Sequence, residues 1–393
     1  MAGPLNGLRI LDFTTLLPGP YATMCMADMG ARVLRIVSGV RPDMASLAPP
    51  YLDDSNLSFA TAFLGRGKRC MTLNLKDERA VRIVHQLLVR HDVVVEQFRP
   101  GVMAKLGLDY GSLKKINPAL VYCSLSGYGQ TGPLKDRAGH DINYLARSGL
   151  MSYSGRKDSG PPLMGMQVAD VASGSHNAII GILAAVVHRQ ATGEGQHIDI
   201  SMTDGCVAFN ALVGCSVLAG EKAPGREEFL LNGGTLYDFY ETADGRHLSF
   251  GGLEPNFFSA FCEAIGRPDL VAGGVAPQNL DAVKEEVREI LRSRSLAEWM
   301  SIFNKTDACV EPVLTLDEVL KDSHVKDRGL VVDLELPRGG RVRQLANPIK
   351  FSRTSQNYGK AGVQAGTHTR EVLRELGYED NQIDEFDETG LFS

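Results

Sequence analysis

The residues best suited to acid/base or nucleophilic chemistry lie in three short segments. His140 and Asp141 are adjacent in AGHDINY, at residues 138–144. Asp170 lies in QVADVASGS, and Glu254 lies in GGLEPNFF. A histidine titrates near neutral pH and a neighbouring carboxylate can hold its tautomer, while an ionised carboxylate can act as a base or as a nucleophile. These four side chains are therefore the candidate catalytic residues.

Each candidate also has an ordinary structural explanation. His140 is one of nine histidines and could be a surface or a core residue. Asp170 stands just before a long apolar segment, where an acid is a common helix N-cap, and Glu254 stands between an expected strand and an expected helix. In favour of function, free amides at a helix start would stabilise an ionised Asp170, and the small residues after it leave room for a substrate. On the residues alone, both explanations stay open.

A glycine-rich stretch, GYGQTG at 127–132, matches the G-x-G-x-x-G pattern of dinucleotide-binding loops. Its context does not fit, because Pro133 and the polar segment LKDRAGH follow it instead of an apolar helix that could hold a pyrophosphate. We therefore expect no nicotinamide cofactor. We interpret the stretch as a loop in which glycines let the backbone approach a ligand closely.

Six basic residues are candidates for binding a phosphorylated ligand. Guanidinium and ammonium groups form charge-assisted hydrogen bonds with phosphate oxygens, and three of the six are gathered in LGRGKR. The alternative is a solvated surface with scattered charges, which composition alone favours. The six are Arg35, Arg41, Arg66, Lys68, Arg69 and Arg99.

The composition argues against several classes of function. The formal net charge of −6 and an isoelectric point near 5.9 speak against a nucleic-acid or membrane-surface binder, because either needs a positive field. We find no apolar run of the ~18 residues that a membrane-spanning helix needs, and no signal peptide at the N-terminus. Seven scattered cysteines show no metal-ligand spacing. We expect a soluble, cytoplasmic protein without a metal site.

The first half of the chain alternates short β-branched runs with helical periods, which indicates a mostly parallel sheet covered by helices. The chain has 393 residues, 44% of them hydrophobic, so it can bury a large core, and its length favours two domains. The expected strands are 8–13, 32–37, 70–75, 92–98, 120–126 and 195–202, and the expected helices are 21–31, 78–91 and a long one from Asp170 to Gly193.

A second region is predicted to fold separately. Residues 221–228 are polar and rich in turn-forming residues, so we interpret them as a linker. Residues 236–250 predict a β-hairpin with its turn at 243–246. The helices expected after this hairpin are 257–265, 280–294 and one that begins at Ser295.

These patterns predict an α/β chain with two domains. The large domain covers 1–220 and is completed by 331–393, and a smaller α+β domain covers 229–330. A last helix is expected at 368–378, followed by an acidic and mobile end.

Nine ordered segments together resemble the CaiB/BaiF family of class III CoA-transferases and α-methylacyl-CoA racemases. The likeness covers nearly the whole chain, and nine segments in order are far more specific than any one motif. The segments are GPLNGLRILDFTTLLPGPYATMCMADMGARVLRI, GRGKRCMTLNLK, FRPGVMAKLGL, SGYGQTGP, AGHDINY, TGEGQHIDISMTDG, YETADGR, GGLEPNFF and TDACVEPVLT.

The resemblance implies a Rossmann-like large domain and a smaller domain in a dimer of two interlocked chains. It also implies that CoA lies on the large domain as part of an acyl-CoA substrate, with no cofactor bound permanently. The reacting end would lie at the seam between the large domain of one chain and the small domain of the other. Arg66, Lys68, Arg69 and Arg99 then become candidates for contacts with the nucleotide.

The two branches of the family use one shared aspartate differently, and Asp170 matches its position in both. In transferases the aspartate attacks an acyl-CoA thioester and passes through an anhydride to an aspartyl-CoA thioester. In racemases it forms an acid/base pair with a histidine across the α-carbon, and the resemblance assigns that histidine to His140. Asp141 is then its neighbour, and Glu254 is the supporting acid of the small domain.

The sequence mixes features of both branches. AGHDINY resembles the racemases, whereas MQVADVASG and GILAAVVHR resemble the transferases. Asn232 stands where racemases often have aspartate, and Ser38 stands where they tend to have arginine, with Arg41 as a possible substitute. Our first hypothesis is an acyl-CoA racemase acting on a 2-methylacyl-CoA.

Two other hypotheses remain. The second is a CoA-transferase that uses Asp170 as nucleophile and works as a homodimer or with a homologous second subunit. The third is a non-catalytic scaffold subunit of such a transferase. The joint presence of His140, Asp170 and Glu254 counts against the third.

Overall fold

A computed structural model describes residues 2–52, 57–273, 275–276, 278–337 and 339–393. They belong to two compact units. The first unit comprises 1–148, 164–209 and 326–393, and the second comprises 149–163 and 210–325. These boundaries differ from the expected ones, because 149–163 and 210–220 belong to the second unit and the expected linker 221–228 lies inside it.

Hydrogen bonds explain why the expected linker is part of the second unit. The Arg156 side chain donates to Glu227 (2.9 Å), and the Arg226 side chain donates to the carbonyl of Ser154 (2.8 Å). Asn232 Nδ2 donates to the carbonyl of Tyr153 (2.8 Å). The polar residues of 221–232 thus form hydrogen bonds with residues 153–156 of the same unit. Their polarity had suggested an exposed linker, but the fold supplies them with partners.

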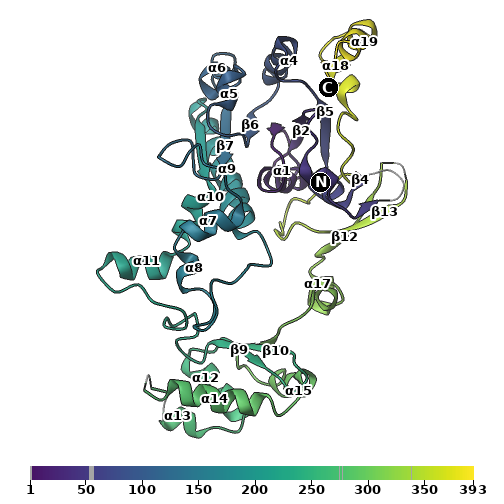
Figure 1. Cartoon of the computed structure of the whole chain (residues 1–393). Helices are drawn as coiled ribbons and strands as arrows, with labels where there is room; N and C mark the ends of the chain where they lie inside the picture. Colours follow the sequence, from purple (N-terminus) through teal and green to yellow (C-terminus); the bar gives the residue numbers. More distant parts are fainter. Residues whose placement is uncertain (1, 53–56, 274, 277, 338) are drawn as a thin grey trace. The chain divides into compact units, whose positions relative to one another are not determined.

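The first unit is built on a six-stranded sheet in the order β5, β2, β1, β6, β7, β8, in which all neighbouring strands are parallel (Figure 1). Each strand overlaps one expected from the sequence, so the predicted parallel α/β sheet is confirmed. The strand order reverses between β1 and β6. The strands are β1 (Arg9–Phe13), β2 (Arg32–Val37), β5 (Lys68–Thr72), β6 (Val93–Glu96), β7 (Val121–Ser126) and β8 (His197–Ser201).

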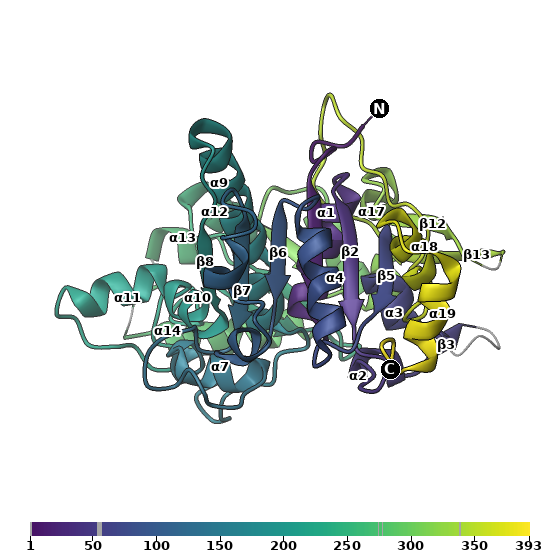
Figure 2. The ribbon, with the colours of Figure 1, turned by 90° about the horizontal axis from the view of Figure 1, so that it is seen from above.

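Helices cover both faces of this sheet (Figure 2). On one face, Leu11, Leu34 and Val94 pack with buried residues of α4 (Glu78–Leu88), α18 (Thr369–Glu375) and α19 (Asp380–Glu388). The neighbouring residue Asp12 points to the other face, where it meets α1 (Pro18–Asp28) through Thr23. Here α1 packs against η2 (Ala169–Ser175) and α9 (His176–Thr192).

The expected mobile end is instead an ordered helix. Glu379 caps α19, and the helix buries Ile383, while Leu391 after it is also buried. Both contribute to the core cluster that includes α4. The acidic residues of this segment lie on its exposed side, so the expectation of mobility was wrong.

The long helix begins as a π-helix, η2, and continues as α9 to a left-handed Gly193 (φ 80°), with Arg189 in its last turn. The predicted helix is confirmed, although its π turn was not expected. By length and mean hydropathy alone, Ala169–Thr192 could cross a membrane, which corrects our statement that no run is apolar enough. Polar residues such as Ser173 and Asn177 interrupt the apolar run in the sequence, although the mean hydropathy of the whole helix is high. One such helix is weak evidence, because core helices pass the same test.

The second unit holds the expected hairpin, β9 (Asp238–Glu241) and β10 (His247–Phe250), with β11 (Val310–Pro312) added antiparallel to β10. Phe250, Phe261 and Trp299 anchor its own hydrophobic core. The helices of this core are α12 (Pro255–Ala264), α13 (Asp269–Gly273), α14 (Leu280–Leu291) and α15 (Leu296–Phe303).

The remaining helices and strands are short. In the first unit they are α2 (Met44–Leu47), β3 (Tyr51–Leu52), β4 (Leu57–Ser58), α3 (Phe59–Leu64), α5 (Val102–Lys105), α6 (Tyr110–Leu113), α7 (Asp141–Arg147), α10 (Met202–Ala208), β12 (Val331–Glu335) and β13 (Arg341–Leu345). In the second they are α8 (Leu150–Tyr153), α11 (Ala211–Leu218) and α16 (Leu316–Val319), and α17 (Ser323–Asp327) crosses the boundary.

Candidate active site

A pocket of about 310 Å³ lies at the carboxyl ends of four strands of the first unit, and we call it the carboxyl-end pocket. It adjoins β1 and β6, where the strand order reverses, which is the usual ligand position in an open parallel sheet. Leu16 and Pro18 follow β1, residues 97–100 follow β6, 126–128 follow β7, and Met202 follows β8. The lining is completed by Lys135, Arg137, Ala138, Gly139, His140, Tyr144 and Asp170.

Two of the predicted catalytic residues, His140 and Asp170, line the carboxyl-end pocket together. Asp170 is half-buried in η2. Burial, and then the negative charge of Asp141, raise the pKa of Asp170 to about 6, while His140 opposes this rise. A carboxyl group with such a pKa is populated in both protonation states near neutral pH. It can therefore take or give a proton there.

Hydrogen bonds from two serines fix η2 against the walls of the pocket. Ser175 Oγ donates to the carbonyl of Pro18 (2.6 Å), in the loop after β1, and Ser173 Oγ donates to the carbonyl of Met202 (2.6 Å), after β8. π-helical turns are rare and occur frequently at functional sites. This turn therefore holds the backbone of Asp170 in place.

Asp141 positions Asp170 and does not line the pocket. Its Oδ1 accepts a hydrogen bond from the backbone N–H of Asp170 (2.9 Å), and it begins α7 directly after His140. The Asp141 carboxylate thus joins α7 to η2 and raises the pKa of Asp170 by its charge. These contacts are those of a positioning residue, and the catalytic assignment of Asp141 stays a prediction.

Close backbone packing fixes the loop that carries His140. The His140 side chain is exposed, and its backbone N–H donates to Asn143 Oδ1 (3.0 Å). A Cβ at Gly139 would lie 2.6 Å from the Tyr144 ring, and one at Gly127 would lie 2.4 Å from it. The backbone of GYGQTG was expected to approach a ligand closely, but at Gly127 it approaches the ring of Tyr144. A side chain at position 127 would collide with this ring, so the position still requires glycine.

Glu254 lies in the second unit. It is exposed and precedes α12 as its N-cap residue, without a side-chain capping hydrogen bond. It is not part of the lining of the carboxyl-end pocket. Its assignment as a supporting acid stays a prediction.

Arg66 and Lys68 are interior residues, which corrects their assignment as CoA ligands. The Arg66 guanidinium is 1% exposed and forms two hydrogen bonds to Asp28, at 2.9 and 2.7 Å. Lys68 Nζ donates to Asp12 (3.2 Å) and to Thr23 (2.6 Å). Since both cations are enclosed and already paired, neither is available to a phosphate at the surface.

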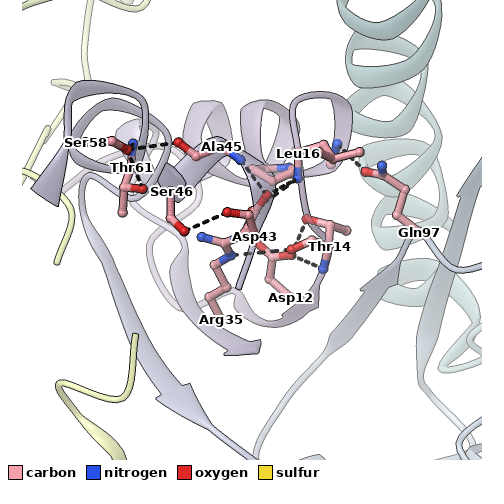
Figure 3. A network of polar contacts seen from close by, with 12 residues as sticks. Asp12, Thr14, Leu16, Arg35, Asp43, Ala45, Ser46, Ser58, Thr61 and Gln97 are labelled. Carbon is pink, nitrogen blue, oxygen red and sulfur yellow. Dashed lines mark hydrogen bonds and ion pairs between the residues drawn. The ribbon is translucent and has the colours of Figure 1, made fainter. Parts of the chain in front are cut away.

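The other basic candidates divide between the interior, the surface and the pocket. Arg35 is buried and paired with Asp43 (Figure 3), which corrects its assignment in the same way. Arg69 forms ion pairs with residues of α18, away from the carboxyl-end pocket, and Arg41 is exposed and does not line that pocket. Of the six, only Arg99 lines it.

Two further basic residues, Lys135 and Arg137, were not among the candidates expected from the sequence. Both are exposed and line the carboxyl-end pocket with Arg99. They lie in LKDRAGH, which we had described only as polar. Their position just before His140 was the available signal. The three cations give this rim a positive charge suited to the phosphates of a CoA thioester.

The loop after β1 is held by the interior polar residues (Figure 3). Leu16 lines the pocket with a left-handed φ of 61°, which is unusual for a residue with a branched side chain. Its backbone N–H donates to Asp43 Oδ1 (3.0 Å), and Gln97 Oε1 accepts from the N–H of Gly19 (2.9 Å). The bond between Gly19 and Gln97 joins the loops after β1 and β6, which both line the carboxyl-end pocket.

The described residues contain no group of three or more His, Cys, Asp or Glu side chains that could hold a metal ion. The chemistry that the carboxyl-end pocket offers comes from a carboxyl group, an imidazole and three cations. That set fits proton transfer or nucleophilic attack on an anionic, phosphate-bearing substrate.

Comparisons with known proteins identify the family. The chain matches CoA-transferase family III over residues 5–369. It is 34% identical over 381 residues to an α-methylacyl-CoA racemase of Homo sapiens, covering 96% of this chain and 95% of that protein. It is 33% identical over 389 residues to a succinyl-CoA:glutarate CoA-transferase of Mus musculus, covering 97% of this chain and 88% of that protein.

A solved structure of a CaiB/BaiF family protein from Brucella suis matches with a TM-score of 0.81 at 29% identity, over 96% of this chain and 100% of that chain. The protein therefore belongs to CoA-transferase family III, and the resemblance to the CaiB/BaiF family is confirmed. It is a member of an enzyme family whose substrates are CoA thioesters. Racemases and transferases match it at similar identity, so family membership alone does not choose between the two reactions.

Proposed function

We propose that the protein is an acyl-CoA racemase that acts at the α-carbon of a 2-methylacyl-CoA thioester. The observation that carries this proposal is that His140 and Asp170 line one pocket, while the pKa of Asp170 is raised to about 6. A carboxyl group with this raised pKa can give up or take a proton near neutral pH, and an imidazole in the same pocket can serve as its acid or base partner.

In the proposed reaction, one of the two groups removes the α-proton from one face, and the electrons of that C–H bond pass to the thioester oxygen as an enolate. The other group then delivers a proton to the opposite face, forming the new C–H bond. The reaction needs the pair to hold one proton at the start and one at the end. Arg99, Lys135 and Arg137 would bind the CoA phosphates through charge-assisted hydrogen bonds.

The second candidate is a CoA-transferase, and the observation that favours it is the accessible Asp170 carboxylate. Asp170 could attack the thioester carbonyl and expel CoA as a thiolate, which would then attack the aspartyl carbonyl of the resulting anhydride, giving an aspartyl-CoA thioester and releasing the donor acid as a carboxylate. The carboxylate of an acceptor acid would attack this thioester and expel CoA thiolate again. The thiolate would then attack the acceptor carbonyl of the second anhydride, giving the new acyl-CoA and the free Asp170 carboxylate. His140 has no required proton transfer in this route, so its substitution separates the two reactions.

The proposed assembly is a homodimer, with a heteromer of homologous subunits as the alternative. Glu254 lies in the second unit and is absent from the lining of the carboxyl-end pocket. A second copy of the chain is, by the resemblance, the source of the acid that would support the pair.

The test is to incubate the protein with one enantiomer of a 2-methylacyl-CoA in D₂O, without any acceptor acid. We expect deuterium at the α-carbon and loss of optical purity. His140→Ala should lower the exchange rate by about 10²-fold or more, the usual contribution of a positioned acid or base. His188→Ala is the matched control, because His188 is exposed on α9 and is not part of the pocket lining.

Absence of deuterium together with hydroxylamine-sensitive labelling of Asp170 by an acyl-CoA would replace the racemase with the transferase. Retained activity of His140→Ala in a CoA-transfer assay would support the same conclusion. If neither exchange nor labelling occurs, the scaffold hypothesis is the one that remains.

A further inference from the structure

A second and larger cavity, of about 680 Å³, lies at the opposite edge of the same sheet. Arg9 is the first residue of β1, Arg32 is the first residue of β2, and Arg69 lies near the start of β5. Arg90 lies just after α4. We call this the amino-end cavity, because it is formed where the strands begin and the carboxyl-end pocket where they end.

Three of these arginines project from one face of the sheet. Arg9 is the register partner of Arg32 in the parallel pair β1 and β2. Arg32 and Leu34 share a face because they are two residues apart on a strand, and Leu34 is the register partner of Arg69. This face is covered by α4 and α18, whose Leu87 and Val372 also line the amino-end cavity.

The positive charge of this cavity is only partly neutralised. Arg9 donates to the carbonyl of Arg90 (3.3 Å), and Arg90 donates to the carbonyl of Glu375 (3.2 Å), so both bind neutral oxygens. The Arg32 guanidinium has no hydrogen bond or ion pair within the part of the chain that the structure describes. Arg69 is paired with Glu371 and Glu375 (3.2 and 2.9 Å).

The remaining lining adds no compensating charge. Glu375 is the only carboxylate among the described lining residues. Burial lowers the pKa of His91, so this histidine is neutral at pH 7. The four guanidinium groups of the cavity therefore meet two carboxylates, Glu375 in the lining and Glu371 beside it, and both pair with Arg69. Arg9, Arg32 and Arg90 have no carboxylate partner among the described residues, on a chain whose net charge is −6.

Like charges at directly opposed strand positions repel each other and destabilise a sheet. Arg9 and Arg32 are register partners at the amino ends of β1 and β2, so their charges lie side by side. An anion bound between the guanidinium groups would relieve this repulsion. A guanidinium group can bind a phosphate through two parallel hydrogen bonds. A cavity with several arginines and few carboxylates therefore favours a phosphate as the bound anion.

We propose that the amino-end cavity binds an organic polyphosphate of nucleotide size. A volume of about 680 Å³ lies within the range of small-molecule sites, and four guanidinium groups match more than one phosphate. Apolar residues beside the arginines, Leu34, Leu87, Val372 and Leu376, favour a ligand that also carries an organic group. This site is separate from the reaction at the carboxyl-end pocket and does not depend on which reaction occurs there.

The test uses inorganic tripolyphosphate as the probe, titrated into the full-length protein by calorimetry. The variant Arg32→Gln/Arg90→Gln removes two charges without leaving a carboxylate unpaired, because neither arginine forms an ion pair within the described residues. We expect its affinity to fall by about tenfold or more for each guanidinium removed, as for hydrogen bonds between charged groups. Lys135→Gln/Arg137→Gln is the matched control, with the same change in charge at the carboxyl-end pocket.

The control variant should keep the high-affinity site. The proposal is overturned if the control loses as much affinity as the Arg32/Arg90 variant, since the probe would then occupy the carboxyl-end pocket. It is also overturned if tripolyphosphate shows no saturable binding. In that case a change in the solution mass of Arg32→Gln/Arg90→Gln would assign the arginines to an interface with an acidic surface of a second copy.

Discussion

Two aspartates of the first unit, Asp12 and Asp170, are both withdrawn from water but have opposite surroundings. Asp12 is fully buried and receives hydrogen bonds from Thr23 Oγ1 (2.5 Å) and from Lys68 Nζ (3.2 Å). Asp170 is half-buried at the carboxyl-end pocket. The charge with the largest effect on its pKa is that of another carboxylate, Asp141. Asp12 has an ion-pair partner, whereas Asp170 has none among the described residues.

Their pKa values show what this difference does. Burial alone raises the pKa of Asp12, but the charges of Lys68 and Arg35 and two threonine hydrogen bonds outweigh it, so the pKa is lower than usual. Burial and a like charge both raise the pKa of Asp170, to about 6. The interior therefore holds Asp12 ionised for stability, whereas the pocket keeps Asp170 able to change its protonation state.

The two regions are nevertheless connected. The ion pair of Arg35 with Asp43 holds the backbone of Leu16 in its left-handed conformation at the wall of the carboxyl-end pocket (Figure 3). A left-handed non-glycine residue costs of order 1–3 kcal/mol and persists only where its surroundings enforce it. Paired charges in the interior thus give the pocket a fixed wall beside its unpaired carboxyl group.

Arg66→Met should give the largest effect on stability. It leaves the buried carboxylate of Asp28 without its bidentate partner, and breaking one side of a buried ion pair costs about 3–5 kcal/mol. We expect the free energy of unfolding, measured in urea, to fall by this amount. Arg99→Met, at the exposed rim of the carboxyl-end pocket, should change it by less than about 0.5 kcal/mol. If both variants lost the same free energy of unfolding, the buried ion pair of Arg66 would contribute no more to stability than the exposed Arg99 side chain.

Asp12→Asn and Asp170→Asn should change stability in opposite directions at pH 7. Asp12→Asn leaves Lys68 buried without its counter-charge, which we expect to destabilise the fold by about 2–3 kcal/mol. The loss is limited because burial already lowers the pKa of Lys68 to about 8, so this ammonium can release its proton. Asp170→Asn removes a half-buried charge that His140 only partly offsets, and it should stabilise by about 1 kcal/mol after allowance for solvent screening.

The same pair of variants has a pH signature. The folded-state pKa of Asp170 is raised, so its contribution to stability is present below pH 3.8 and is lost as the pH rises through about 6. The folded-state pKa of Asp12 is lowered, so its contribution is present above pH 3.8 and is lost as the pH falls through its folded value. The advantage of Asp170→Asn over the wild type should therefore shrink at pH 4. A constant advantage would contradict the raised pKa.

The reaction itself should depend on the ionisation of Asp170. Below pH 6, kcat/KM should fall by about tenfold for each pH unit, because the pKa of Asp170 is about 6 and the fraction of free enzyme with an ionised Asp170 then falls tenfold per unit. The same acid limb is expected if Asp170 acts as a nucleophile. The measurement is the pH profile of α-proton exchange or of CoA transfer. A rate that stays level down to pH 4.5 would show that Asp170 has an ordinary carboxyl pKa.

The sheet and the long helix could be predicted from the sequence because their signals are local. Strands such as 32–37 are β-branched runs, and α9 ends at a glycine that follows a basic last turn. The helix α19 could not be predicted, since it is ordered by burial of Ile383 and Leu391 among residues distant in the sequence. The acidic composition of that segment described only its exposed side.

The candidate site was predictable in part. His140 and Asp170 were selected by resemblance, and the structure places both at one pocket, but no sequence pattern showed that Asp141 bonds to the amide of Asp170. Arg66 and Lys68 were misassigned because neighbours in the sequence do not reveal their partners. Those partners, Asp28 and Asp12, come from other elements that only the fold brings close.

The smallest expected effect compares two exposed arginines, Arg99 and Arg41. Arg99 lines the carboxyl-end pocket and Arg41 does not, although the resemblance suggested Arg41 as a possible substitute for a family arginine. Arg99→Gln should raise the KM for acyl-CoA by about tenfold, the loss of one charge-assisted hydrogen bond, with little change in kcat. Arg41→Gln should change KM by less than about twofold, within the usual range for surface substitutions. Steady-state kinetics with one acyl-CoA measures both effects. A larger effect at Arg41 would mean that bound CoA extends beyond the carboxyl-end pocket along the end of β2. Exposed cations outside that pocket would then also bind the substrate.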